Sequence, residues 1–311
     1  MVYLVLVLGL VILLAGGKYL VDGASDLAAR FGLSPGLIGL TVVAFGTSAP
    51  ELLVSINAAL KGNSEIALGN VIGSNIANIS LVLGISAVLY PIIIYKSVLK
   101  LDYLATLICS ILFFILAYNG IISRMEGILL FVIMLFLNWY FFKKLSKVDE
   151  EIISEEEVEE MIKKTPLAYS LFFFILGVLG LYFGSDLFVD SAVKISEIFG
   201  VSERVIGITV IAIGTSLPEM VTSVIAAIKK QTDIAIGNIL GSNIMNILAI
   251  IGITSMISPI PVADVFLKQD FIWMVGITIL LFPILRSKLQ ISRWEGLLLL
   301  AIYGVYIYAL L

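Results

Sequence analysis

Two glutamates inside long apolar segments are the residues of this sequence best suited to chemistry. Glu51 lies in GTSAPE and Glu219 in GTSLPE, and apolar residues flank each motif over the length of a membrane-spanning helix. A carboxylate in the hydrocarbon core of a bilayer is costly, so it needs a partner. Two carboxylates in matching motifs therefore predict a shared cation site.

Hydroxyl and amide side chains accompany both glutamates at helical spacing, so we expect them on the same helix faces as the carboxylates. A second motif, GNxxGSNIxNI, follows each GTSxPE and continues the pattern in the next predicted helix. The candidate groups are Thr47, Ser48, Ser55, Asn70, Ser74 and Asn78 in the first copy, and Thr215, Ser216, Ser223, Asn238, Ser242 and Asn246 in the second.

Prolines next to the two glutamates predict a break in each helix. Pro50 and Pro218 lack an amide hydrogen and clash with the carbonyl four residues earlier, which belongs to Gly46 or Gly214. Irregular backbone at membrane depth is tolerated where it is buried in protein or lines a wet cavity. Carbonyls freed in this way are natural ligands for a cation.

The predicted donor set consists of oxygen atoms alone. The chain has no histidine and a single cysteine, Cys109, which excludes an intrachain disulfide and argues against a zinc site. Carboxylate, hydroxyl, amide and carbonyl oxygens suit a hard cation such as Ca²⁺ or Na⁺. Two ionised glutamates balance one Ca²⁺ or two Na⁺, so the same cage can hold either load in turn.

Several polar and small residues also have a structural interpretation. Helix packing, bonding to the residue's own helix, capping and an interfacial position each explain some of them without ligand binding. This interpretation stays open for Gly69, Gly73, Gly237, Gly241, Ser55, Ser223, Asn70, Asn238, Asp22, Asp26, Asp186 and Asp190.

The composition predicts an all-α membrane protein. Apolar residues make up 60% of the chain, against about 45–50% in soluble domains. The net charge of -4 offers no basic surface for nucleic acid. We expect ten transmembrane helices, at roughly 2–21, 36–60, 66–94, 101–119, 125–142, 167–190, 204–228, 234–258, 269–285 and 294–311. The first is interpreted as a mature span, since no basic segment precedes it.

An internal repeat organises these helices. The stretch from Gly39 to Ile85 recurs from Gly207 to Ile253 with about half of its residues identical. Five spans per half is an odd number, so the second half enters the membrane from the opposite side, which gives two inverted five-helix repeats. The predicted units are 1–143, a linker at 144–166, and 167–311. Lysine and arginine gather in one set of loops, which predicts a plasma-membrane protein with both termini outside.

The linker is the longest polar segment, and its acids cluster in DEEIISEEEVEE. A solvated, partly helical cytoplasmic linker is the favoured interpretation. A regulatory cation site is the alternative.

The paired motifs GTSAPE with GNVIGSNIANI and GTSLPEM with GNILGSNIMNI resemble the two repeats of the cation/calcium antiporters, and most closely the sodium/calcium exchangers of archaea and bacteria. The resemblance covers nearly the whole chain. It implies exchange of external Na⁺ for internal Ca²⁺, with the first and sixth spans sliding against the other eight. The implied ligands are Glu51, Glu219 and the backbone oxygens of Thr47 and Thr215 for Ca²⁺, and for Na⁺ the Ala44 and Ala212 carbonyls with Ser48, Ser216, Ser74 and Ser242. Asn78 and Asn246 are implied to face the centre.

One departure from the family pattern concerns Asn78 and Asn246. Many relatives carry aspartate at one or both positions, whereas both are amides here. The charge of the site therefore stays at that of two glutamates. Potassium co-transport, which accompanies aspartate in the family, becomes less favoured, and the ion stoichiometry stays open.

The sequence thus predicts a secondary antiporter with no cofactor, no chemical step and no obligatory protein partner. An H⁺/Ca²⁺ exchanger is the alternative, with protons on Glu51 and Glu219; the paired Ser48 and Ser216 favour Na⁺. A cation channel could use the same glutamates as a filter, but would pass current without a counter-ion. An intramembrane hydrolase would need a nucleophile with a base or a catalytic metal.

Overall fold

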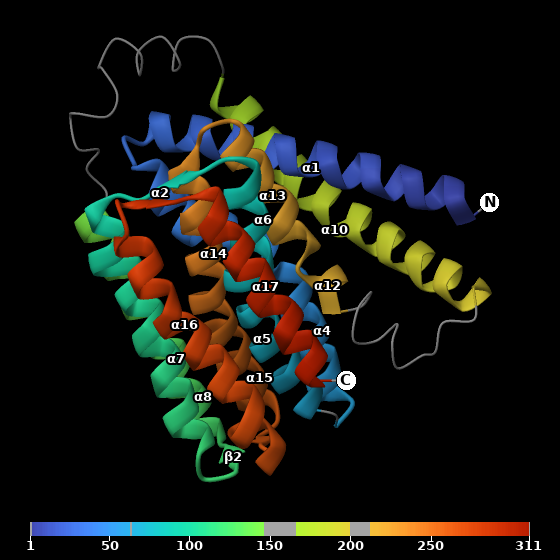
Figure 1. The fold of residues 1–311 in the computed structure, drawn as a ribbon, viewed down its shortest axis with the longest axis vertical. Helices are drawn as coiled ribbons and strands as arrows, with labels where there is room; N and C mark the ends of the chain where they lie inside the picture. The colour runs from blue at the N-terminus through green and yellow to red at the C-terminus, as the bar shows by residue number, and fades with distance from the viewer. Residues whose placement is uncertain (1, 63, 146–165, 200–211, 311) are drawn as a thin grey trace.

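The computed structural model describes residues 2–62, 64–145, 166–199 and 212–310, and these are almost wholly helical (Figure 1). Most of the predicted linker, residues 146–165, lies outside them. So do residues 200–211, which include the start of the span expected at 204–228.

The first half follows the predicted order of spans, with π-helical segments, labelled η, inside several of them. Its elements are α1 (Val2–Arg30), α2 (Pro35–Ile38), η1 (Gly39–Val43), α3 (Ala44–Thr47), α4 (Ala49–Leu60), α5 (Glu65–Ala77), η2 (Asn78–Val82), α6 (Leu83–Leu89), β1 (Ile92–Ile93), η3 (Val98–Asp102), α7 (Tyr103–Ala117), β2 (Ile121–Ile122) and α8 (Arg124–Leu145).

The second half repeats this order. Its described elements are α10 (Leu167–Ile198), α12 (Ala212–Thr215), α13 (Leu217–Ile228), α14 (Thr232–Met245), η5 (Asn246–Ile251), α15 (Gly252–Ile257), β3 (Ile260–Pro261), η6 (Phe266–Asp270), α16 (Phe271–Arg286), β4 (Gln290–Ile291) and α17 (Arg293–Leu310).

Helix length and hydropathy identify a multi-pass membrane protein. In the described ranges eight helices are long and apolar enough to cross a bilayer. The count rises to nine if the bent pair Pro35–Thr47 and Ala49–Leu60 forms one span. The span expected at 204–228 is described only from Ala212, and its apolar helix α13 is too short to count alone.

Two spans form the centre of the bundle. The most apolar part of Thr232–Ile257 is buried throughout, and that of Ile66–Leu89 is buried over 78% of its residues. By contrast, Arg124–Lys144 is buried over only 17%, so its apolar side chains face outward, as expected next to lipid. The motif GNxxGSNIxNI therefore lies in the core.

The two halves contact each other reciprocally. Strand β1 pairs with β4, joining Ile92 to Ile291, and β2 pairs with β3, joining Ile122 to Ile260. Strand β3 is the repeat counterpart of β1, and β4 is that of β2. The β1–β4 pair and the β2–β3 pair are therefore equivalent contacts between the two halves. Helices α6 with α17 and α8 with α15 are also paired in this way.

Helices α1 and α10 pack closely along their lengths and extend from one edge of the molecule (Figure 1). Glycines allow the approach: a Cβ added at Gly180 would lie 2.9 Å from the Gly16 Cα, and one added at Gly16 would lie 2.6 Å from the Leu181 amide nitrogen. Helix α1 ends at Arg30, beyond the predicted end at residue 21, because Ala24, Leu27 and Ala28 continue its buried face. The apolar run marked the membrane segment of α1 and not the end of the helix.

Candidate ion-binding site

Helix breaks position the two glutamates. Ser48 separates α3 from α4 with φ -85° and ψ 6°, and Ser216 separates α12 from α13 with φ -89° and ψ 8°. The predicted opening at Pro50 and Pro218 is therefore confirmed, and the first half bends there by 44°. Glu51 lies in the first turn of the helix that follows, where the helix dipole favours a carboxylate, and Glu219 occupies the same place in its copy.

The ladder of backbone hydrogen bonds is interrupted at the first break. The Ser48 amide donates to the Ala44 carbonyl over 3.0 Å, and the Leu52 amide donates to the Ser48 carbonyl over 3.2 Å. Pro50 has no amide hydrogen, and no backbone bond joins the Glu51 amide to the Thr47 carbonyl in the described chain. The Thr47 carbonyl, one of the expected Ca²⁺ ligands, thus accepts no bond within the helix. The Ala44 carbonyl already accepts two bonds, from the Ser48 amide and from the Thr47 hydroxyl.

Hydroxyl groups from both halves meet at Glu219, whose side chain is buried. The Ser48 hydroxyl donates to Glu219 Oε1 over 2.8 Å, and the Ser242 hydroxyl approaches the same oxygen at 3.5 Å. Thr47 Oγ1 lies 3.4 Å from the Ser242 hydroxyl. The structure therefore brings these predicted residues together across the two repeats.

Seven buried oxygens of the candidate residues, including three of the four carboxylate oxygens, have no hydrogen-bond partner in the part of the chain that the structure describes. Buried polar atoms are normally paired, and an unpaired one is costly. A bound cation would satisfy many of them at once. The atoms are Glu51 Oε1 and Oε2, Glu219 Oε2, Ser74 Oγ, Ser216 Oγ, Asn78 Oδ1 and Asn246 Oδ1.

Asn70 and Asn238 brace the carboxylate helices. The Asn70 amide donates to Ser55 Oγ over 3.2 Å and to the backbone oxygen of Glu51 over 3.4 Å. The Asn238 amide donates in the same way to Ser223 Oγ over 3.0 Å. This geometry favours the bridging interpretation of both asparagines and gives both serines a structural partner.

Two residues that the sequence did not single out, Asn75 and Asn243, connect the remaining candidates. Asn78 Nδ2 donates to Asn243 Oδ1 over 3.0 Å, and Asn246 Nδ2 donates to Asn75 Oδ1 over 3.1 Å. All four side chains are buried, and Asn78 and Asn246 each begin a π-helical segment. The only signal in the sequence was that both copies of GNxxGSNIxNI carry an asparagine at this position, the second of the three in the motif.

A cavity of about 260 Å³, lined by both polar and apolar residues, lies next to Thr215 at the end of α12. Pro50, Asn57, Ser185 and Asp186 contribute to its walls, between α4, α10 and α12. The Ser185 hydroxyl also donates to the Gly214 carbonyl over 3.1 Å. Of the four aspartates left open by the sequence, Asp186 thus lines a cavity that also contacts Thr215, one of the candidate ligands.

The equivalent region of the other repeat is closed. A Cβ added at Gly17 of α1 would lie 2.6 Å from Val221 Cγ1 and 2.9 Å from Ile225 Cδ1 of α13. Lys229, just after α13, forms an ion pair with Asp22 of α1. Repeat-related surfaces are therefore open at one place and packed at the other.

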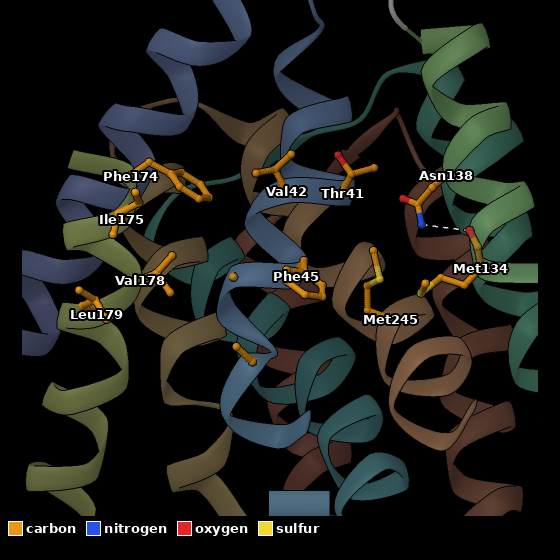
Figure 2. Close-up of a pocket in the computed structure, with 12 residues that line it drawn as sticks. Thr41, Val42, Phe45, Met134, Asn138, Phe174, Ile175, Val178, Leu179 and Met245 are labelled. Carbon is orange, nitrogen blue, oxygen red and sulfur yellow. Dashed lines mark hydrogen bonds between the residues drawn. The ribbon is translucent and has the colours of Figure 1, made fainter. Parts of the chain in front are cut away.

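A separate cavity of about 520 Å³ is almost entirely apolar (Figure 2). Phe45, Phe174 and Met245 line it. Asn138 lines it as well, but its side-chain amide donates to the Met134 carbonyl of its own helix over 3.0 Å. This cavity lacks the oxygen ligands that a cation needs.

Known proteins similar to this chain are ion exchangers and membrane proteins. A family model described as "Sodium/calcium exchanger protein" matches residues 1–143 and 169–311. The putative antiporter CaxA of Alkalimonas amylolytica is 39% identical over 308 residues, covering 97% of this chain and 96% of that protein. The sodium/calcium exchanger MaX1 of Methanosarcina acetivorans is 33% identical over 344 residues, covering 99% of this chain and 98% of that protein. A solved structure of the sodium-calcium exchanger NCX_Mj matches with a TM-score of 0.86 at 34% identity and full coverage of both chains.

These matches extend over both halves, and the motifs around Glu51 and Glu219 lie within them. The similar proteins are transporters and not enzymes, so no cofactor is implied. This chain belongs to the sodium/calcium exchanger family and is a helical, multi-pass membrane antiporter of that family.

Proposed function

We propose that this protein exchanges Na⁺ for Ca²⁺ at a site between Glu51 and Glu219. The group of buried oxygens without partners around two carboxylates is the observation that carries this proposal. The proposed ligands are Glu51, Glu219, Thr47, Thr215, Ser48, Ser216, Ala44, Ala212, Ser74, Ser242, Asn78 and Asn246.

Charge and ligand chemistry support the exchange of these two ions. Two carboxylates neutralise one Ca²⁺ or two Na⁺, so each load can replace the other without leaving the site highly charged. The hydroxyls of Ser48 and Ser242 already lie against Glu219. Such neutral oxygens add ligands for Na⁺, which a proton does not need, so they favour Na⁺ over H⁺ as the coupling ion.

The proposed architecture is ten spans in two inverted repeats, residues 1–143 and 167–311, joined by a linker at 144–166. Reciprocal pairing of β1 with β4 and of β2 with β3 supports it. With both termini outside the plasma membrane, the C-terminal end of α4 faces outward and that of α13 faces inward.

Alternating access follows from the difference between the repeats. The open cavity at Asn57 and Asp186 leads toward Thr215 on the outer side, whereas α13 packs against α1 on the inner side. Since α1 and α10 pack as a pair, sliding them together would close the first path and open the second.

Ca²⁺ uptake into proteoliposomes loaded with Na⁺ and diluted into Na⁺-free buffer tests the exchange. Uptake should require internal Na⁺ and persist when an ionophore collapses any pH gradient. Uptake driven by a pH gradient alone would assign H⁺/Ca²⁺ exchange, and uptake that needs neither gradient would indicate a channel. Glu51→Gln should abolish uptake, and wild-type uptake by that variant would refute the site.

A further inference from the structure

The amide groups of Asn75 and Asn243 are held in one orientation by backbone carbonyls. Asn75 Nδ2 donates to the Asn243 carbonyl over 3.4 Å, and Asn243 Nδ2 donates to the Asn75 carbonyl over 3.2 Å. A carbonyl oxygen can only accept, so each amide must turn its nitrogen toward the other helix. Asn75 Nδ2 also lies 3.8 Å from Met274 Sδ, a weak acceptor.

This orientation fixes that of the next pair of amides. Asn75 Oδ1 can only accept, so Asn246 presents Nδ2 to it over 3.1 Å. Asn243 Oδ1 receives Asn78 Nδ2 over 3.0 Å in the same way. As a result, Asn78 Oδ1 and Asn246 Oδ1 are buried and have no hydrogen-bond partner in the described chain.

We propose that Asn75 and Asn243 are positioning residues, each turning the side-chain oxygen of an asparagine in the opposite repeat toward the transported cation. Asn75 orients Asn246, and Asn243 orients Asn78. This inference rests on the proposed function, because it requires those two oxygens to be ligands. It adds two residues that do not themselves touch the ion.

The same bonds disfavour a negative charge at the two oriented positions. A carboxylate in place of Asn246 would set an acceptor against Asn75 Oδ1. Turning Asn75 over would break its bond to the Asn243 carbonyl and place two oxygens together. Asn75 and Asn243 thereby keep the charge of the site at that of Glu51 and Glu219.

Double-mutant analysis of Ca²⁺ binding to the purified full chain tests the pairing. Asn246→Ala should weaken Ca²⁺ binding, and Asn75→Ala should weaken it about fivefold, the value of one net hydrogen bond. Because Asn75 acts through Asn246, the double variant N75A/N246A should bind no more weakly than N246A alone. In N75A/N78A the two losses should multiply, although residues 75 and 78 are neighbours on one helix.

Ser80→Ala is the control for a structural effect. Ser80 is buried in the same span, and among the described residues its hydroxyl bonds only to the Ile76 carbonyl of its own helix, so this variant should keep wild-type Ca²⁺ affinity. If N75A does not fold, N243A with N78A tests the same coupling from the other repeat. A loss of affinity in S80A equal to that in N75A would point to general loosening of the helix and overturn the proposal.

The outcomes separate the two levels of inference. Wild-type Ca²⁺ affinity in N246A and N78A would remove both oxygens from the proposed site, and the positioning role with them. Weaker binding in N246A together with a further loss in N75A/N246A would leave the site intact and refute the positioning role.

Discussion

Glu51 and Glu219 occupy matching motifs but have different hydrogen-bond partners. Glu219 Oε1 accepts the Ser48 hydroxyl, whereas both carboxylate oxygens of Glu51 are unpaired among the described residues. Ser216, the counterpart of Ser48, is buried with an unpaired hydroxyl. In this conformation the protein itself satisfies one carboxylate in part and leaves the other without a partner among the described residues.

This difference predicts unequal effects of two matched variants. Ser48→Ala removes both a proposed Na⁺ ligand and a hydrogen bond to a carboxylate, which contributes about 1.5–3 kcal/mol. We expect the Na⁺ concentration for half-maximal Ca²⁺ uptake to rise about tenfold or more. Ser216→Ala should give a smaller rise, measured in the same proteoliposomes. An equal or larger effect of Ser216→Ala would contradict the inequality of the two glutamates.

The sequence singled out the carboxylates, hydroxyls and amides of the proposed site, but not Asn75 and Asn243, which are proposed to orient the amides of Asn246 and Asn78. Repeated motifs and a four-residue spacing were sufficient to select Glu51, Ser74 and Asn78. Asn75 falls outside that spacing, and its partners lie 168 and 171 residues away in the other repeat. Contacts of that range depend on tertiary packing, which helical periodicity does not encode.

At the scale of the helices, glycines join α1 and α10 into one body. A Cβ added at Gly177 would lie 2.4 Å from the Leu20 amide nitrogen, and one added at Gly184 would lie 2.5 Å from the Leu13 amide nitrogen. Backbone atoms cannot move aside as a side chain can. The two helices must therefore separate or shift if either position is enlarged.

Gly180→Leu tests this packing. The added side chain would meet the backbone of Gly16, and overpacking of this kind costs about 1–3 kcal/mol. We expect a lower unfolding temperature in detergent and loss of Ca²⁺ uptake. Gly304→Leu in α17 is the matched control, since a Cβ there would have no neighbour within 4 Å. Equal loss of stability in both variants would argue against a specific α1–α10 interface.

The sequence predicted some properties of the helices and missed others. The breaks at Pro50 and Pro218 were predictable because proline acts locally on its own helix. The π-helical turns that begin at Asn78 and Asn246 were not, since they carry neither proline nor an exceptional spacing. The true end of α1 was missed because burial of residues 24–28 depends on neighbouring helices.

At the scale of the whole molecule, two surfaces related by the repeat differ in how closely they pack. Asn57 is exposed at the open cavity, and its counterpart Ile225 lies against Gly17 of α1. Asp22 pairs with Lys229, whereas no ion pair joins their counterparts Asp190 and Lys61, both of which the structure describes. Among the residues that the structure describes, one of these two repeat-related surfaces is therefore open and the other is packed.

Cysteine labelling tests this asymmetry on a clean background, because the single native cysteine, Cys109, is buried. We expect Asn57→Cys to react quickly with a thiol reagent in the absence of ions, and Ile225→Cys to react slowly. A membrane-impermeant reagent applied from outside intact cells should reach Asn57→Cys, because the open path is proposed to face outward. Equal rates, or labelling of Asn57→Cys only from the cytoplasmic side, would refute the proposed state or orientation.

The ion pair between Asp22 and Lys229 should stabilise the conformation that is open at Asn57. Both side chains are partly exposed, 45% for Asp22 and 29% for Lys229, so the pair contributes no more than about 1 kcal/mol. Lys229→Gln should therefore shift the population away from this conformation and slow the labelling of Asn57→Cys, by at most about fivefold. In the opposite conformation the pair to form is Lys61 with Asp190, so Lys61→Gln should leave labelling of Asn57→Cys as fast as before or faster. If Lys229→Gln had no effect, or both variants slowed labelling alike, the two ion pairs would not act as alternating gates.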